Sequence, residues 1–276
     1  MKDLMTVARK VSKVASTMGG VKAIVIYGSL AEGFADEHSD INLFAVCSTI
    51  PKSDTRRKLL EKQFEWIVFK NGAMPDWRIK SQDFFFVDGK NITFLYKKES
   101  ELNFVAELIK SDRYISRDLF RETLAYLSTS KAIYDPNKIM PKLKAKMPKA
   151  TPQLLKYFLP SLEHLSIKEI WPRTHFKQAL KRGNYWFVGE MVDLQIENFL
   201  ICLHAINNKH YTSPMWAVKS VKGLSLKPTA TVSRLQKISQ LGNSPKDTEK
   251  KLHLLTSLVS DFKKLIIEEK VFNFLE

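Results

Sequence analysis

Apolar and polar positions follow two different patterns along the chain. Early in the chain, short apolar runs at 23–27 and 41–47 are typical of buried strands. Apolar residues spaced three and four apart in residues 1–17 predict an amphipathic helix. Beyond residue 151 the strand patterns end. Helical spacing there predicts helices over 154–165, 176–208, 232–241 and 248–272.

A lysine-rich segment separates the two patterns. Residues 131–136, Lys-Ala-Ile-Tyr-Asp-Pro, predict a short strand that Asp-Pro ends. Residues 138–149 then hold five lysines and two prolines, which predicts a basic linker with a short helix. The fold class is therefore predicted to be α+β. We expect a sheet with flanking helices at 1–137, the linker at 138–150 and an all-α helical-bundle domain at 151–276.

The segment from residue 24 to residue 46 combines the features of a phosphate site. An apolar run ends at Gly28, which can take backbone angles closed to other residues and lets a phosphate approach the main chain. Ser29 follows where a helix would begin, and N–H groups at a helix start attract anions. Side chains two apart on a strand point the same way, so Asp40 and Asn42 share one face. The pattern predicts that both face the Gly28–Ser29 turn.

This segment resembles the signature of the nucleotidyltransferase superfamily, in which Gly-Ser is followed by two carboxylates separated by one apolar residue. The matching residues are Gly28, Ser29 and Asp40, with Ala31, Gly33 and Ser39 of the common bacterial variant. The resemblance implies the mixed sheet of the nucleotidyltransferase fold. It also implies transfer of a nucleoside monophosphate from an NTP, with ATP expected, to a hydroxyl of a small acceptor. Gly28, Ser29 and Asn42 would then bind the nucleotide.

Two positions depart from the family pattern. Asn42 stands at the place of the second carboxylate, and a predicted hairpin at 83–96, with its turn at Asp88-Gly89, puts Thr93 at the place of the third. The resemblance thus implies Asp40, Asn42 and Thr93 as the metal ligands. Amide and hydroxyl oxygens bring no charge to a Mg²⁺ site. We therefore expect Mg²⁺ affinity to be weak or lost, unless Asp83 or Asp88 compensates.

The helical half supplies a candidate general base. Glu190, Asp193 and Glu197 are spaced three and four apart, so they share one stripe of a predicted helix. Aromatic residues at 184–187 and 203–211 resemble the helical domain of antibiotic nucleotidyltransferases, in which a carboxylate deprotonates the acceptor hydroxyl. The resemblance implies Asp40, with Glu190 or Asp193, as catalytic residues. The alternative for this stripe is a solvated polar surface.

Charge and composition limit the kinds of partner that we expect the chain to bind. The formal net charge is +15, from 44 Lys and Arg against 29 Asp and Glu, and the excess is spread over both halves. Such a field attracts ATP, nucleic acid or an acidic partner and disfavours cationic aminoglycosides as acceptors. The chain has no run of membrane-spanning length, and its two cysteines have apolar neighbours and no zinc-type spacing. These features favour a cytoplasmic protein with no membrane partner.

Three functions stay open at this point. The first is an active nucleotidyltransferase. The second is a catalytically degenerate module that binds a nucleotide or a protein. The third is a protein that binds or acts on nucleic acid. A ribonuclease related to the helical domain is not expected, because His204 and His210 lack the neighbouring arginine of those enzymes.

Overall fold

The structure is a computed structural model, and it describes residues 2–64, 68–69, 82–110, 125–147, 155, 158–159, 162 and 178–269. The chain divides into two compact units, Met1–Pro148 and Lys149–Glu276. The division falls ten residues or so after the Asp-Pro that ends the last predicted strand.

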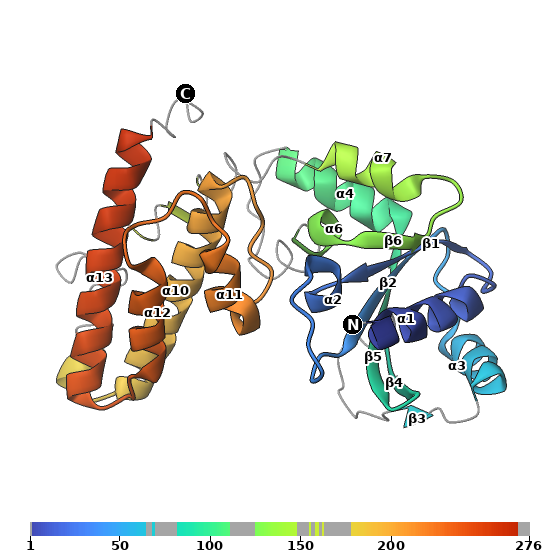
Figure 1. The fold of residues 1–276 in the computed structure, drawn as a ribbon, viewed down its shortest axis with the longest axis horizontal. Helices are drawn as coiled ribbons and strands as arrows, with labels where there is room; N and C mark the ends of the chain where they lie inside the picture. Colours follow the sequence, from blue (N-terminus) through green and yellow to red (C-terminus); the bar gives the residue numbers. More distant parts are fainter. Residues whose placement is uncertain are drawn as a thin grey trace. The chain divides into compact units, whose positions relative to one another are not determined.

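The first unit contains both helices and strands (Figure 1). Its helices are α1 (Lys2–Ala15), α2 (Ser29–Glu32), α3 (Ser53–Gln63), α4 (Glu99–Lys110), α6 (Tyr126–Thr129) and α7 (Ile139–Lys146). Its strands are β1 (Val21–Tyr27), β2 (Ile41–Cys47), β3 (Val68–Phe69), β4 (Gln82–Val87), β5 (Lys90–Lys98) and β6 (Lys131–Tyr134). The amphipathic first helix, the two apolar strands, the hairpin and the short strand before Asp-Pro are thus confirmed as elements.

The six strands form one mixed sheet in the order β3-β4-β5-β2-β1-β6. β2 and β5 run parallel, and the other neighbouring pairs are antiparallel. The parallel pair brings Asn42 opposite Thr93, and the antiparallel pair brings Tyr27 opposite Asn42. This register decides which polar residues meet at the candidate site.

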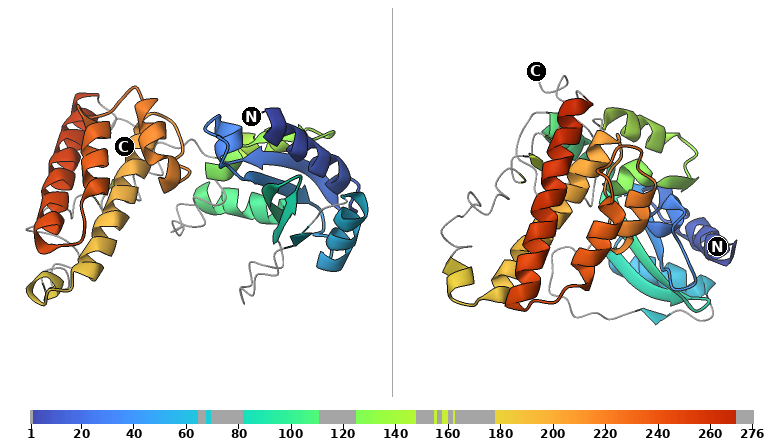
Figure 2. Two further views of the ribbon diagram at one scale, coloured as in Figure 1. Left: turned by 60° about the horizontal axis from the view of Figure 1, so that its bottom comes forward. Right: turned by 60° about the vertical axis from the view of Figure 1, so that its left-hand side comes forward.

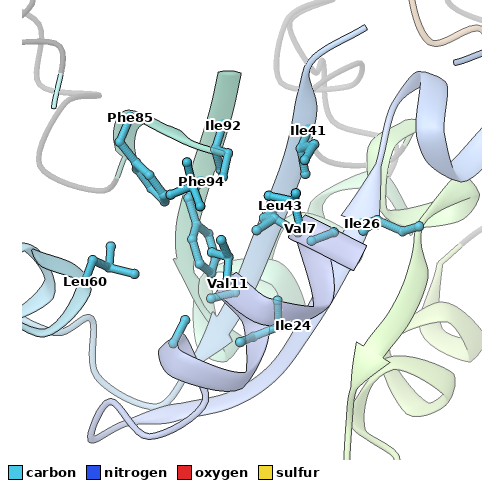
Figure 3. Packing of buried hydrophobic residues seen from close by; sticks show 14 of the residues in the cluster. Val7, Val11, Ile24, Ile26, Ile41, Leu43, Leu60, Phe85, Ile92 and Phe94 are labelled. Carbon is cyan, nitrogen blue, oxygen red and sulfur yellow. The ribbon is translucent and has the colours of Figure 1, made fainter. Parts of the chain in front are cut away.

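Helices cover both faces of the sheet, with α1 and α3 on one face and α4, α6 and α7 on the other (Figures 1 and 2). Under α1 and α3 lie Ile24 and Ile26 of β1, Leu43 of β2 and Phe94 of β5, packed against Leu60 of α3 (Figure 3). The opposite face packs Val25, Phe44 and Val46 against Leu102, Leu127 and Leu143. Successive side chains of a strand point to opposite faces, so the nearly unbroken apolar runs of β1 and β2 fill both layers.

The basic segment belongs partly to this core. Asp135 caps α7, because its carboxylate accepts hydrogen bonds from the backbone N–H groups of Ile139 and Met140, at 2.8 and 2.9 Å. Ile139, Met140 and Leu143 are buried against the sheet. The lysines of α7 therefore lie on a helix that is anchored by its apolar side.

The described elements of the second unit are helices: α10 (Tyr185–Ile206), η3 (Pro214–Trp216), α11 (Ala217–Lys222), α12 (Thr231–Gln240) and α13 (Pro245–Glu268). Both α10 and α12 contact α13. The helix predicted over 176–208 is divided, because Gly183 has φ +68° and Asn184 caps α10 with its side chain. A bundle over the whole of 151–276 stays a prediction, because residues 163–177 lie outside the described part.

Candidate functional site

The turn after β1 has a backbone that favours glycine. Gly28 has φ +68° and ψ −151°, a combination that side chains rarely allow. A Cβ atom at this position would lie 3.4 Å from Nδ2 of Asn42. The turn therefore packs directly against the side chain of Asn42, as the sequence predicts.

Asp40, directly before β2, and Asn42 of β2 lie on one side of the strand and are joined by a hydrogen bond. The Asn42 amide nitrogen Nδ2 donates a hydrogen bond to Oδ1 of Asp40 at 2.9 Å. A carboxylate can only accept, so the NH₂ group of Asn42, and not its oxygen, must face Asp40. The two side chains meet as donor and acceptor, whereas two metal ligands would both turn oxygen atoms toward a cation.

Thr93 completes the row of the three predicted metal ligands. It lies opposite Asn42 on the adjacent strand β5, and directly opposed residues of neighbouring strands point to the same face. Asp40, Asn42 and Thr93 are all half-buried. Of these three positions only Asp40 carries a charge. Within the described part of the chain, no group of three or more His, Cys, Asp or Glu residues could hold a metal ion. The donor set does not fit two Mg²⁺ ions.

Ser29 is the least accessible of the predicted nucleotide-binding residues, at 6% exposed. Its carbonyl oxygen accepts hydrogen bonds from the N–H groups of Gly33, Phe34 and Ala35. α2 is only four residues long. Ser29 thus ties down the loop that leads to Asp40.

The alternative carboxylate Asp83 lies on the face of the sheet opposite to Asn42 and Thr93, so it cannot join them as a metal ligand. It is opposite Phe94, whose ring packs under α1 and α3. Arg56 of α3 binds it with two hydrogen bonds, Nε to Oδ2 at 2.7 Å and Nη2 to Oδ1 at 2.8 Å. Burial would lower the pKa of Arg56, but its hydrogen bonds with Asp83 and the attraction between them raise that pKa above its usual value. Asp83 is a structural residue.

Asp88 also has a partner. It occupies the β4–β5 turn with φ +51° and makes an exposed ion pair with Lys10 of α1, at 3.0 Å. Its carboxylate is thus drawn toward α1, which covers the face opposite to Asn42 and Thr93. The structure brings together Gly28, Asp40, Asn42 and Thr93, and it adds neither Asp83 nor Asp88 to them.

The predicted general bases lie on α10 in the second unit. Glu190 and Asp193 are exposed, and Glu197 is half-buried. This agrees with a stripe along one side of the helix. A catalytic role for Glu190 or Asp193 stays a prediction.

His204 is buried near the end of α10, and His210, just beyond the helix, is half-buried. The ring of His204 lies 2.7 Å from the carbonyl oxygen of Leu200 through Nδ1 and 3.1 Å from the hydroxyl of Ser220 through Nε2. Because a carbonyl only accepts, Nδ1 carries the proton. Burial lowers the pKa of both His204 and His210 to about 4. Both rings are therefore neutral near pH 7, and that of His204 packs against Tyr211, with ring centroids 5.2 Å apart.

Phe84 is a further residue on this face of the sheet that the sequence did not identify as a candidate site residue. It lies opposite Thr93 on β4 and is 43% exposed, although its neighbour Phe85 is fully buried. The three consecutive phenylalanines at 84–86 gave no sign of which ring would face solvent. The exposure of Phe84 is evident only from the structure.

Fold and site together define an α+β protein in which a glycine turn and a single carboxylate meet at one end of a mixed sheet. Among the described helices, none has the length and apolar character needed to cross a membrane. No family model matches the sequence, and no curated protein does.

Among solved structures, the chain is similar to a nucleotidyltransferase-like protein from Exiguobacterium sibiricum 255-15. The identity is 11% and the TM-score is 0.39, over 93% of this chain and 75% of the other. A similarity of this size does not bear on the site or on its chemistry.

Proposed function

We propose that this chain is a nucleotidyltransferase-like protein that binds a nucleotide, as its magnesium complex, beside Asp40 and the Gly28 turn, and that has lost two-metal transfer. The observation that carries the proposal is the meeting of Gly28, Asp40, Asn42 and Thr93, with the Asn42 amide donating to Asp40. The glycine turn supports close approach of a phosphate. The single carboxylate supports one contact to a cation that the nucleotide brings.

Charge at the site argues for binding without turnover. Two-metal phosphoryl transfer depends on carboxylates that fix both cations against the attacking and leaving oxygens. Here two of the three positions are neutral, and one oxygen of Asp40 already accepts a hydrogen bond from Asn42. The overall charge of +15 assists the approach of any triphosphate, with ATP expected.

The alternative is an active enzyme that transfers a nucleoside monophosphate to a hydroxyl of a small acceptor. Asp40 would then hold Mg²⁺ with help from Asn42 and Thr93, and Glu190 or Asp193 would deprotonate the acceptor. If this alternative holds, the wild type releases pyrophosphate. Asp40→Ala and a variant that removes the general base, Glu190 or Asp193, do not. The hydrogen bond between Asn42 and Asp40 favours the binding function over this one.

The test is calorimetry of ATP and the other NTPs, with and without Mg²⁺, on the wild type, on Asp40→Ala and on Asn42→Asp/Thr93→Asp. We expect the wild type to bind weakly, Asp40→Ala to bind less, and the double variant to gain Mg²⁺-dependent affinity. Asp88→Asn is the matched control, since Asp88 is a carboxylate of the same unit that pairs with Lys10.

Two results would overturn the proposal. Absence of wild-type binding at millimolar NTP, weaker than about −4 kcal/mol, would mean that the turn holds no nucleotide. Release of pyrophosphate by the wild type would show that transfer survives with one carboxylate. Binding of short RNA with a steep salt dependence, and no binding of NTP, would favour the nucleic-acid function instead.

A further inference from the structure

An exposed aromatic ring lies on the same face of the sheet as the candidate site. Phe84 of β4 is 43% exposed, while Phe85 and Val87 of the same strand are at most 1% exposed and pack under α1 and α3. Figure 3 shows Phe85 within that apolar cluster. Since strand side chains alternate, Phe84 points to the opposite face.

The register places this ring in one row with the polar residues. Phe84 is opposite Thr93, Thr93 is opposite Asn42, and Asn42 is opposite Tyr27. Neighbouring strands are about 4.8 Å apart, so Phe84 lies about 10 Å from Asn42 across the sheet. Thr93, the residue between them, is half-buried and carries a hydroxyl.

This spacing suits a nucleotide laid across the strands. A sugar separates the base of a nucleotide from its first phosphate. Phosphates held beside Asp40 and Gly28 therefore leave the base one sugar away, over β4 or β1. On the β1 side the row ends in Tyr27, which is 6% exposed. Its ring packs against that of Tyr126, with the two ring centroids 4.7 Å apart. On the β4 side it ends in the accessible ring of Phe84.

We propose that Phe84 is the base-stacking residue of this site, so that the ligand is a nucleotide recognised by its base as well as by its phosphates. The proposal rests on the proposed function and extends it to the ligand's base. Every nucleobase has a π face, and stacking on an aromatic side chain is tolerant of base identity. The larger ring system of a purine should stack best.

The experiment compares ATP with inorganic tripolyphosphate, both with Mg²⁺, because tripolyphosphate has the phosphates but no base. It uses the wild type, Phe84→Ala, Phe84→Tyr and the control Phe104→Ala. Phe104 is 64% exposed and lies on helix α4, not on a strand of the row. We expect Phe84→Ala to weaken ATP binding by about 5- to 150-fold, the usual range for one stacked base, and to leave tripolyphosphate binding unchanged. Phe84→Tyr and Phe104→Ala should bind both ligands as the wild type does.

Three outcomes would overturn the stacking role while leaving the phosphate site intact. They are unchanged ATP affinity in Phe84→Ala, an equal loss of affinity for both ligands, and wild-type affinity for tripolyphosphate that matches that for ATP. Failure of the wild type to bind either ligand would instead overturn the proposed function, and the stacking role with it. The two failures are therefore distinguishable in one titration series.

Discussion

The buried ion pair between Arg56 and Asp83 allows a sharp test of how the first unit is held together. The Arg56 side chain is 1% exposed and that of Asp83 is 9% exposed. Besides its two hydrogen bonds to Asp83, Arg56 donates through Nη1 to the carbonyl oxygen of Pro51 at 2.6 Å. Its guanidinium carbon lies 4.5 Å from the ring centre of Tyr96. The perturbation is Asp83→Ala, which leaves this buried cation without its carboxylate.

The expected loss follows from what remains around Arg56. Removing one partner of a buried pair generally costs about 3–5 kcal/mol. The Pro51 carbonyl and the Tyr96 ring still stabilise the guanidinium, and a desolvated cation–π contact contributes up to about 2 kcal/mol. We therefore expect the lower end, about 3 kcal/mol. At about 2–4 °C per kcal/mol for a unit of this size, Tm falls by about 6–12 °C.

Scanning calorimetry measures this change, and hydrogen exchange of peptides from α3 and β4 localises it to the first unit. Arg57→Ala is the matched control, since the neighbouring Arg57 pairs with Glu61 where both side chains are 41–50% exposed. That exposed pair contributes about 0.5 kcal/mol or less. The apolar replacement Arg56→Met/Asp83→Leu should recover most of the lost stability. A loss below about 1 kcal/mol in Asp83→Ala would refute the reasoning, because it would mean that Arg56 reaches water when Asp83 is removed.

Three further predictions concern stability and reactivity. Gly28→Ala should lower the free energy of unfolding by about 1–3 kcal/mol because of its backbone angles, whereas Gly19→Ala, with nothing within 4 Å of the new Cβ, should change it little in the same urea titration. His204 has a pKa of about 4 in the folded chain against an ordinary 6.5. Its contribution to the free energy of unfolding is therefore fully present above pH 6.5, and that free energy falls by about 3 kcal/mol as the pH falls toward 4. A His204→Gln variant should show a flatter dependence of unfolding free energy on pH between 7 and 4, and an identical slope would contradict this. Burial raises the pKa of Cys47 to about 12 and raises that of Cys202, so both thiols should react with Ellman's reagent at pH 8 only after denaturation; fast reaction of the native chain would disprove it.

Hydrophobic patterning was sufficient to predict β1 and β2, and the reason is physical. β1 and β2 are buried on both faces, and such strands give continuous apolar runs that few other structures produce. The division of the helix predicted over 176–208 was missed. An apolar period of three and four continues through Gly183, and only its positive φ ends the first helical segment there. The periodicity of apolar residues shows which side of a helix is buried, but it does not show where the chain changes direction.

The candidate site was predictable as far as it depends on short sequence separations. Gly28, Asp40 and Asn42 come from one strand-turn-strand segment, so their proximity follows from side-chain alternation. Thr93 lies opposite Asn42 only through the register between β2 and β5, and the sequence prediction placed it there by aligning the Asp88-Gly89 turn with the family pattern. The partners of Asp83 could not be predicted, because nothing in the sequence distinguishes Arg56 from Arg57. The buried one faces the sheet and the exposed one faces Glu61.

Asn42 affects the stability of the free protein as well as the proposed contact to a cation. Two carboxylates about 4 Å apart near a protein surface repel each other by about 4 kcal/mol, and a site with acids at both positions needs a cation to relieve that repulsion. In this chain the Asn42 amide donates a hydrogen bond to Asp40 instead, so the site is satisfied without a cation. We therefore expect an amide at this position to give lower metal affinity than a carboxylate in two ways: it brings no charge as a ligand, and it leaves no repulsion for metal binding to relieve. For this reason Asn42→Asp should make stability, and not only nucleotide affinity, depend on Mg²⁺.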